Sequence, residues 1–203
     1  MAIKEHKEDY IYIYREFGSG KKWKKLSKKE SIKLELGSGP KLGKNGWTTI
    51  DIGYSDISWD LRKGIPLKND SVETIYSSHL LEHIPYEDLI KFLKECYRVL
   101  KRNGEFSVCV PNFKAYVTAY MRGQVFCERE KWWKPAAIDT GSIIDQLNYM
   151  AYMKDEHKYM FDSQNLVNTF LKAGFSKVKM RSFDEEMDKK ERDFESIYAI
   201  AYK

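Results

Sequence analysis

The stretch Leu34-Glu35-Leu36-Gly37-Ser38-Gly39-Pro40 decides how this 203-residue chain is interpreted. It joins an apolar segment, residues 32–36, to a Gly-x-Gly turn. Because glycine lacks a Cβ atom and tolerates positive φ, such a turn lets the backbone approach a ligand closely. A second apolar segment, residues 47–51, ends on Asp51, whose carboxylate can accept hydrogen bonds from a ribose diol. Together they predict a nucleoside-binding crevice at the carboxyl edge of a parallel sheet.

The rest of the chain alternates short apolar segments with amphipathic ones. Apolar residues recur at helical spacing over residues 86–100, and Asn103-Gly104 predicts the end of that helix. A second helix is expected over residues 163–173, with Gly174 at its end. The pattern predicts an α/β fold with a Rossmann-like, doubly wound sheet of about seven strands, mostly parallel with an antiparallel C-terminal strand pair. The expected strands are residues 32–36, 47–51, 57–61, 72–77, 105–110, 176–183 and 194–202.

Composition sets the class and the compartment. A hydrophobic fraction of 42% supplies a core, and a net charge of +5 favours an anionic substrate without requiring nucleic acid. The three cysteines, Cys96, Cys109 and Cys127, are far apart and lack a zinc-binding spacing, so we expect reduced thiols and no metal site. Residues 1–9 are mostly charged, and no apolar run reaches the ~20 residues that cross a bilayer. We therefore expect a cytoplasmic protein with no transmembrane segment.

Two regions lie outside the regular alternation. Residues 1–30 form a basic and aromatic arm, with lysines concentrated at 21–29, which is either a solvated amphipathic helix or a phosphate-binding arm over the active site. Residues 31–203 form the main domain. Within it, residues 114–160 are rich in aromatic side chains and are expected to be an insertion on the acceptor side.

At this point the chain resembles a known family. Residues 34–39, Asp51, Asp60-Leu61, residues 77–83 and residues 98–105 look like the ordered motifs of class I S-adenosylmethionine-dependent methyltransferases. The "type 11" branch is the nearest match, and within it small bacterial enzymes of surface-polysaccharide (sugar, capsule) biosynthesis. One departure stands out: Asp51 follows Gly39 by only about a dozen residues, so the helix between them must be short or missing.

The resemblance implies a cofactor, S-adenosylmethionine, and roles for the residues that match its motifs. Asp51 would hold the ribose hydroxyls and Ile52 would pack on the adenine. Asp60 would accept from the adenine amino group, while the Leu61 amide donates to a ring nitrogen. The methionine portion would lie against the backbone of the first motif and the carbonyls that follow the fourth strand, at Glu35, Gly37, Ser38, Gly39, Ser77 and Ser78.

Transfer to a hydroxyl requires a general base, for which histidine is suited by its pKa. His79 follows the fourth expected strand directly, and His83 lies one helical turn later. His157 belongs to the acceptor-side insertion. Each of the three is a candidate base and, equally, a candidate structural histidine. Glu82 is expected to support His83 or the helix.

The sequence predicts a methyltransferase that produces S-adenosylhomocysteine and methylates a hydroxyl of a small acceptor. The favoured acceptor is a phosphate-bearing molecule, namely a nucleotide-activated sugar or a surface-glycan precursor. Three alternatives stay open: an RNA methyltransferase that uses the lysines at 21–29, a small-molecule amine methyltransferase, and a non-catalytic module that binds S-adenosylmethionine. A nicotinamide-dependent dehydrogenase is disfavoured because Gly43 follows Gly39 one residue too late for G-x-G-x-x-G.

Overall fold

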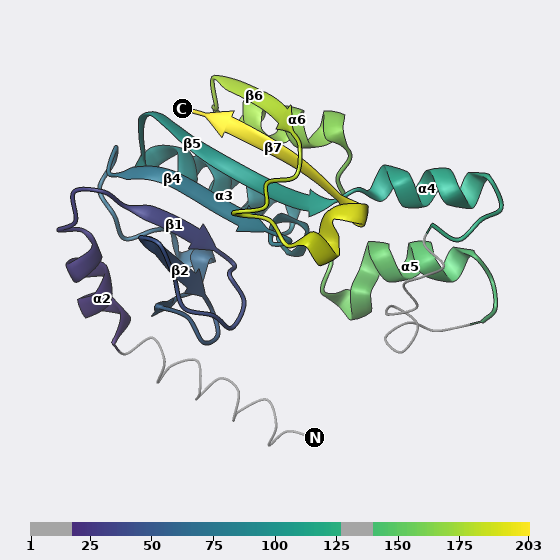
Figure 1. The fold of residues 1–203 in the computed structure, drawn as a ribbon, viewed down its shortest axis with the longest axis horizontal. Coiled ribbons are helices and arrows are strands. Elements are labelled where there is room, and N and C mark those ends of the chain that lie inside the picture. The colour runs from purple at the N-terminus through teal and green to yellow at the C-terminus, as the bar shows by residue number, and fades with distance from the viewer. Residues whose placement is uncertain (1–17, 127–139) are drawn as a thin grey trace, which may run out of the picture.

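A computed structural model describes residues 18–126 and 140–203 of the chain. Seven strands form one mixed sheet in the order β3-β2-β1-β4-β5-β7-β6 (Figure 1). The first five strands run parallel, and β7 pairs antiparallel with both β5 and β6. The predicted fold class is confirmed. The strands are β1 (Lys33–Leu36), β2 (Trp47–Asp51), β3 (Ile57–Ser58), β4 (Val72–Ser78), β5 (Leu100–Pro111), β6 (Lys177–Arg181) and β7 (Ser196–Tyr202).

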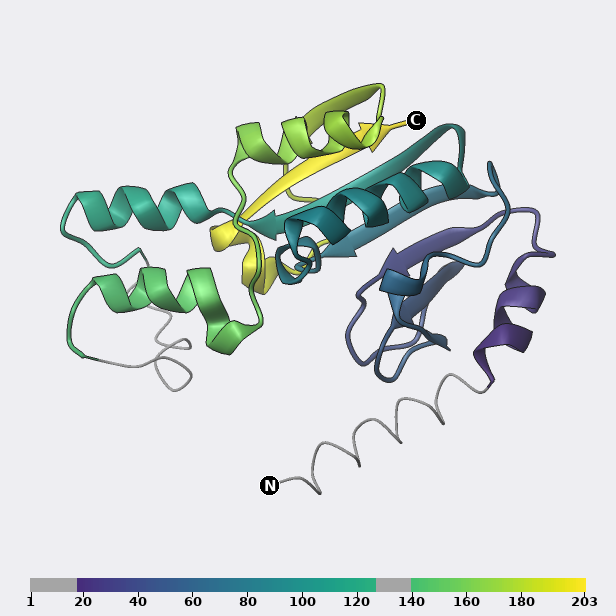
Figure 2. The same cartoon turned by 180° about the vertical axis from the view of Figure 1, so that it is seen from behind.

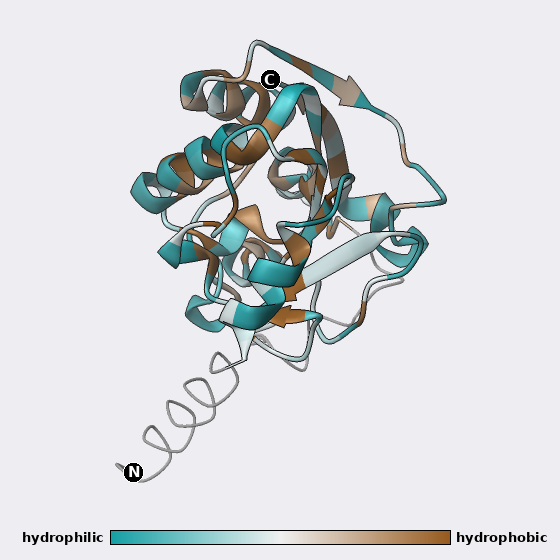
Figure 3. Cartoon of the chain, turned by 90° about the vertical axis from the view of Figure 1, so that its left-hand side faces the viewer, coloured by the Kyte–Doolittle hydropathy of each residue, from teal (hydrophilic) through white to brown (hydrophobic). Residues whose placement is uncertain are grey.

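One face of the sheet is covered by two helices, α3 (Tyr86–Val99) and α6 (Ser163–Ala173), as Figure 2 shows. The apolar stripe of α3 includes Leu89, Leu93 and Cys96, all fully buried. Gly174 ends α6 in the left-handed conformation that glycine favours. In the side view of Figure 3, hydrophobic colour concentrates on the strands and on the helix sides toward them. This layering places the core between the sheet and the two helices.

Some element boundaries differ from the prediction. The third strand ends at Ser58, because Asp60 instead caps a short 3₁₀ helix, η1 (Leu61–Lys63). The fifth begins at Leu100, five residues early, since Leu100 pairs with Val72 before residues 101–104 loop out of register. Asn103 has φ of +63° in this excursion, so the Asn-Gly turn exists but lies inside the strand. Cys96 and Cys109 are buried free thiols, as expected.

No helix separates β1 from β2, as the short spacing from Gly39 to Asp51 predicted; residues 37–46 form a loop. The carboxylate of Asp56 holds this loop in place. Its Oδ2 accepts hydrogen bonds from the Gly43 and Thr49 backbone N–H groups, at 2.9 and 3.0 Å, and from Thr49 Oγ1 at 3.0 Å. The hydrogen bonds to the Asp56 carboxylate thus order this loop in place of an intervening helix.

The N-terminal helix α2 (Ser19–Leu26) packs beside β3. Trp23 and Leu26 are buried in the main core, while the lysines of the helix are exposed. Ser19 Oγ donates to the Ser58 carbonyl at 2.7 Å, and Lys22 Nζ donates to the Asp56 carbonyl at 2.6 Å. This part of the predicted arm is therefore attached to the domain at the end of β3. None of the described helices is long and apolar enough to cross a membrane.

Two further helices, α4 (Phe113–Met121) and α5 (Ile144–Tyr152), project beyond the end of the sheet (Figure 1). Tyr116, Tyr149 and Met150 form a small core of their own between them. Met153–Asp155 (η4) and Lys190–Glu195 (η5) are short 3₁₀ turns near this end, and Leu81–His83 (η2) is another after β4. Cys127, Arg129, Trp132 and Trp133 lie outside the described residues.

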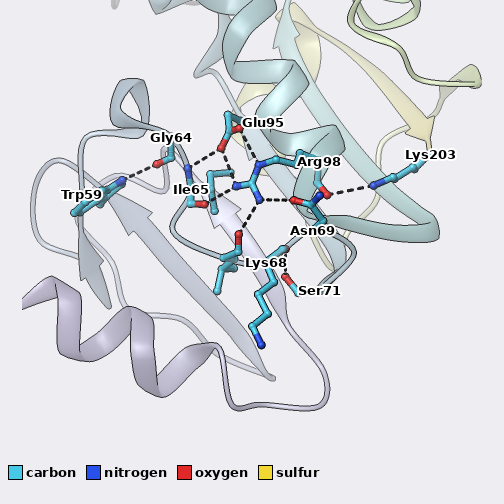
Figure 4. A network of polar contacts seen from close by, with 10 residues as sticks. Trp59, Gly64, Ile65, Lys68, Asn69, Ser71, Glu95, Arg98 and Lys203 are labelled. Carbon is cyan, nitrogen blue, oxygen red and sulfur yellow. Dashed lines mark hydrogen bonds and ion pairs between the residues drawn. The ribbon is translucent and has the colours of Figure 1, made fainter.

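A polar network centred on Arg98 ties α3 to the loop before β4 (Figure 4). The guanidinium makes two hydrogen bonds to the Glu95 carboxylate, both at 2.9 Å. It also donates to the carbonyls of Ile65 and Leu67, at 2.8 Å each, and to Asn69 Oδ1. The planar fork of arginine suits this arrangement, because it presents several donors in fixed directions. The network fixes α3, whose N-terminus follows the segment that carries His79 and His83.

Candidate functional site

The predicted site residues gather where parallel strands end. In the sheet register Leu36 lies beside both Ile50 and Ser77, so Gly37, Asp51 and Ser78 follow at the same edge. Ligands of open α/β sheets bind outside the carboxyl ends of the strands. The fold therefore brings the glycine turn, the acidic strand end and the Ser77-Ser78 segment to the position where a crevice is expected.

The glycines of the turn have different tasks. Gly37 has φ of +66°, and an added Cβ would lie 2.7 Å from Leu80 Cδ1 and 2.9 Å from Leu80 Cβ. Gly39 also has positive φ, +67°, but no described heavy atom lies within 4 Å of its Cβ position. Gly37 is thus required by close packing on the segment after β4, whereas the space beside Gly39 is open.

The Asp51 carboxylate closes the turn. Its Oδ2 accepts from the Gly39 N–H at 2.9 Å, and its Oδ1 accepts from the Gly53 N–H at 2.9 Å. Although only about a dozen residues separate Gly39 from Asp51, the hydrogen bond between them holds the carboxylate beside the glycine turn. The next residue, Ile52, is an apolar side chain with 48% of its surface exposed.

Other predicted cofactor residues have partners of their own. Asp60 accepts from the Arg62 backbone N–H at 3.0 Å and pairs with the Arg62 guanidinium, and these hydrogen bonds lower the pKa of its carboxyl group. Glu35 pairs with Lys41 at 2.6 Å. Ser38 Oγ donates to the Gly39 carbonyl at 3.0 Å. Leu61 packs on the main core, and Ser77 is fully buried while Ser78 is half-buried at the end of β4.

The three predicted histidines meet beside the end of β4, around Glu82. His79 has φ of +52°, an uncommon conformation for a non-glycine residue, and its N–H donates to the Cys109 carbonyl at 2.9 Å. Its Nδ1 lies 3.5 Å from Glu82 Oε1, and its Nε2 lies 2.9 Å from Ser196 Oγ. Strained backbone of this kind concentrates at functional sites. We call the four residues Glu82, His79, His83 and His157 the histidine cluster.

His83 and His157 stand edge to face, with ring centroids 4.9 Å apart. The Nδ1 atom of His83 is 3.2 Å from the Glu156 carbonyl, and the Nδ1 atom of His157 is 2.6 Å from the Met150 carbonyl. Because a carbonyl only accepts, each Nδ1 carries the proton and each Nε2 is left with its lone pair. The Nε2 atom of His83 lies 3.9 Å from Glu82 Oε1.

Glu82 is the most unusual member of the cluster. Its residue surface is 1% exposed, and among the described residues neither carboxyl oxygen has a hydrogen-bond partner. Burial raises the pKa of this carboxyl group to about 8. Burial also lowers the pKa of His79 well below its ordinary value, with the charge of Arg192 adding to the effect. The pKa values of His83 and His157 are lowered by burial as well, so the three rings are neutral near pH 7.

The main chain holds the cluster together across the fold. The carbonyl of Glu82 accepts hydrogen bonds from the Lys158 and Tyr159 N–H groups, at 2.7 and 3.1 Å. This clamp brings His157, from the segment after α5, against the turn after β4. The cluster opens on a cavity of about 290 Å³ lined by His79, Pro111, Met150, Met153, His157, Glu191, Arg192, Phe194 and Glu195.

Sequence reasoning found the three histidines but gave Glu82 only a supporting role, and it missed Arg192 and Ser196. The spacing His-x-x-Glu-His over residues 79–83 could have indicated a shared site. Two aromatic residues of the expected acceptor-side insertion, Tyr116 and Tyr149, belong to the small core between α4 and α5. Helix α2, which carries four of the lysines of the predicted arm, packs beside β3 and lies on the opposite side of the molecule from α4 and α5 (Figure 1).

Comparisons with known proteins bear on the class of protein to which this fold corresponds. Residues 48–108 match a family described as "Methyltransferase domain". A SAM-dependent methyltransferase from Archaeoglobus fulgidus has a similar structure, with TM-score 0.52 and 15% identity over 93% of this chain and 94% of that one. Phosphoethanolamine N-methyltransferase 2 of Haemonchus contortus, in complex with S-adenosyl-L-methionine, has TM-score 0.51 and 11% identity over 91% of this chain. This chain spans about half the length of that protein (52%).

No curated protein matches the sequence. The fold is that of α/β methyltransferases, and residues 48–108 are similar to a methyltransferase domain. The expected class, S-adenosylmethionine-dependent methyltransferase, and its expected cofactor are supported at this level. The solved structures that resemble the chain include an N-methyltransferase, and the acceptor is a separate question.

Proposed function

We propose that the chain transfers the methyl group of S-adenosylmethionine to a hydroxyl of a small acceptor, a nucleotide-activated sugar or a surface-glycan precursor. The observation that carries this proposal is the position of the histidine cluster. The cluster begins directly after β4, and Leu80, which lies between His79 and Glu82 in the sequence, packs against Gly37 of the glycine turn. A methyl donor held at the turn and an acceptor held at the cluster would therefore be neighbours.

The residues at the turn fit the cofactor. The open space beside Gly39 leaves room for the methionine portion of the cofactor. Glu35, Gly37 and Ser38 would also lie against this portion. Asp51 uses one hydrogen bond at each carboxyl oxygen, so lone pairs are left for the ribose hydroxyls. Exposed Ile52 offers an apolar surface to the adenine.

Asp60 and the Leu61 amide would contact the edge of the adenine. Asp60 is now paired with Arg62, whose side chain is 73% exposed, and exposed ion pairs contribute little energy. Replacing Arg62 by the adenine amino group as the partner of Asp60 would therefore cost little free energy. The carbonyls of Ser77 and Ser78 would approach the amino group of the methionine portion.

The cofactor supplies the activated group. When bound, S-adenosylmethionine supplies a methyl on a sulfonium, and the sulfur keeps the bonding electron pair and leaves as S-adenosylhomocysteine while the acceptor oxygen takes the methyl. The protein aligns the acceptor and excludes water, which is catalysis by proximity and orientation.

His79 is the proposed general base. Ser196 Oγ donates to the Arg192 carbonyl at 2.6 Å, so the 2.9 Å contact with His79 Nε2 requires the proton on that nitrogen. Nδ1 is then the atom that accepts the hydroxyl proton of the acceptor. The resulting imidazolium would lie 3.5 Å from Glu82 Oε1, and its positive charge would favour ionisation of that carboxyl group. His157 and His83 remain the other candidates for this role.

Arg192 supports a phosphate-bearing acceptor. It lines the cavity next to His79 and His157, and a guanidinium can bind phosphate oxygens in a bidentate manner. Met150, Met153 and Phe194 supply an apolar wall on which a sugar ring could pack.

The acceptor is tested by supplying nucleotide sugars, amines and RNA to the protein and measuring S-adenosylhomocysteine. We expect release with at least one nucleotide sugar. Release with amines or RNA only would replace the acceptor class. Binding of S-adenosylmethionine with no turnover on any acceptor would indicate a non-catalytic module.

The base is tested by His79→Ala. Turnover should fall at least about 100-fold, because general base catalysis contributes roughly 10²–10⁴, while the affinity for S-adenosylmethionine should be unchanged. The exposed variant Lys158→Ala serves as a control for a local change. Normal turnover in His79→Ala would remove His79 as the base.

A further inference from the structure

A buried, unpartnered carboxylate surrounded by imidazole nitrogens needs a physical explanation. An ionised carboxylate that leaves water without a partner loses a large solvation free energy, and buried charges in proteins are therefore paired or coordinate metals. Glu82 is 1% exposed, and neither of its carboxyl oxygens has a hydrogen-bond partner among the described residues. Without a partner this carboxyl group is held in its protonated form, and a bound cation would allow it to ionise.

The geometry of the cluster is that of a set of ligands. One donor atom each from Glu82, His83 and His157 lies within 4.8 Å of the other two. Bonds of ~2.1 Å from a tetrahedral cation to nitrogen and oxygen place the donors about 3.4 Å apart. The contact between Glu82 Oε1 and His83 Nε2, at 3.9 Å, is already near that value. Small side-chain rotations would bring the three donors to coordination distance.

The hydrogen bonds outside the cluster are also those of metal ligands. Histidines that bind metals usually donate their second ring N–H to a carbonyl or carboxylate, which fixes the ring and leaves the other nitrogen for the metal. His157 donates from Nδ1 to the Met150 carbonyl at 2.6 Å, and His83 donates from Nδ1 to the Glu156 carbonyl at 3.2 Å. Both Nε2 lone pairs are thereby left for coordination.

We propose that Glu82, His83 and His157 bind one divalent first-row transition-metal cation at the acceptor end of the site. Two imidazole nitrogens and one carboxylate oxygen suit Zn²⁺, Fe²⁺ or Mn²⁺ better than Ca²⁺, which prefers oxygen ligands alone. With three protein ligands, at least one coordination position is left for water or an acceptor.

The position of the cation beside the cavity indicates its role, and this assignment rests on the proposed function. His157 and His79 both line the cavity, so a cation on His157 would be next to the acceptor. A bound cation can orient an acceptor hydroxyl and lower its pKa. His79, whose Nδ1 is 3.5 Å from Glu82, would then take the proton from a hydroxyl already held by the metal.

The experiment uses the full chain without a histidine tag, stripped with a chelator and dialysed into metal-free buffer. Zn²⁺ is then titrated by calorimetry, and bound metal is counted after gel filtration by mass spectrometry. The proposal expects one equivalent of Zn²⁺. It also expects visible ligand-field absorption when Co²⁺ replaces Zn²⁺, a signature that a merely structural cluster would not produce.

Variants identify the ligands. Glu82→Gln and His157→Ala should each weaken Zn²⁺ binding at least about 100-fold, since loss of a direct ligand exceeds the 10–100-fold cost of losing a supporting hydrogen bond. The matched control is Glu156→Gln, the same change in an exposed side chain next to His157, which should bind Zn²⁺ like the wild type. His79→Ala should bind within a few-fold of the wild type.

Circular dichroism establishes that each variant is folded before it is scored. Absence of stoichiometric binding in the wild type would overturn the proposal, and so would full binding by the folded Glu82→Gln variant. Neither readout needs methyl donor or acceptor. A protein that binds Zn²⁺ but transfers no methyl group would refute the proposed function and leave the metal site supported. A protein that transfers a methyl group but binds no Zn²⁺ would refute the metal site and leave the proposed function supported.

Discussion

Two buried carboxylates of this molecule have opposite surroundings. Asp188, whose side chain is fully buried, lies in the loop between β6 and β7 and is completely partnered. It accepts two hydrogen bonds from the Arg181 guanidinium, one from Tyr76 Oη at 3.0 Å and one from the Asp184 N–H at 2.8 Å. Glu82 is equally buried, yet no described residue donates a hydrogen bond to it.

The difference separates scaffold from site. The partners of Asp188 join strands β4 and β6 to the loop that crosses the uncovered face of the sheet, so its carboxylate is used within the fold. The Glu82 side chain lies among three imidazoles beside a cavity, and its carboxyl oxygens accept no hydrogen bond from the part of the chain that the structure describes. We infer that Asp188 is needed for stability, whereas Glu82 is needed for a ligand.

The largest effect on stability is expected for Asp188→Asn. The amide cannot pair with Arg181, whose side chain is only 11% exposed, and removing one partner of a buried ion pair costs about 3–5 kcal/mol. The free energy of unfolding, measured in urea, should fall by about 3 kcal/mol. The control is Asp184→Asn, an acid of the same loop. A loss below about 1 kcal/mol for Asp188→Asn would contradict the view that the hydrogen bonds and ion pair of Asp188 stabilise the fold.

The glycine turn allows the same separation of scaffold from site, with a smaller effect. Gly37→Ala forces a Cβ against Leu80 at positive φ and should cost about 2 kcal/mol in unfolding free energy. Gly39→Ala has the same backbone strain but open space, and should cost about 1 kcal/mol.

For cofactor binding we expect the opposite order: Gly39→Ala, which loses less stability than Gly37→Ala, should lose more affinity for S-adenosylmethionine. Calorimetry with S-adenosylmethionine should show weaker binding by Gly39→Ala, because the methyl occupies the space proposed for the methionine portion. Unchanged affinity in Gly39→Ala would place the cofactor elsewhere.

The smallest effect concerns Asp56 in the loop between β1 and β2, and it depends on pH. Burial alone would raise the pKa of Asp56, but hydrogen bonds from Thr49 and Gly43 outweigh burial and lower the pKa below 3.8. A carboxyl whose pKa is depressed in the folded state stabilises the fold above its unfolded pKa, and the contribution is lost as pH falls through the folded value.

Asp56→Asn should therefore lower the unfolding free energy by about 1 kcal/mol at pH 7. The deficit should begin to shrink below about pH 4, the unfolded pKa of an aspartate, and should be smallest below the lowered pKa of folded Asp56. Parallel urea titrations of both proteins from pH 3 to pH 7 measure this. A deficit that grows as pH falls would contradict the assignment.

Much of this could be predicted from the sequence. The glycine turn, Asp51 and the alternating segments are local patterns, and they predicted the sheet and its carboxyl edge. The missing helix between β1 and β2 followed from the count of residues between Gly39 and Asp51. The early start of β5 could not be predicted, because Leu100 extends the strand only by pairing with Val72, which is distant in sequence.

The histidine cluster was predicted only in part, for the same reason. His79 and His83 are near the end of β4 in the sequence, and their place could be inferred. The isolation of Glu82 depends on the segment after α5, which folds against it through the hydrogen bonds of Lys158 and Tyr159. A side chain without a partner can be recognised only when all its neighbours are in place.

The most direct measurement of the central claim is the unfolding free energy of Glu82→Gln beside Asp188→Asn, in urea at pH 7 with a chelator present. Both variants change a buried carboxylate to an amide of the same shape. If Glu82 is kept for a ligand, Glu82→Gln will match the wild type within about 0.5 kcal/mol or exceed it, while Asp188→Asn will lose about 3 kcal/mol. A comparable loss in Glu82→Gln would show that Glu82 holds the fold together, and the account would be wrong.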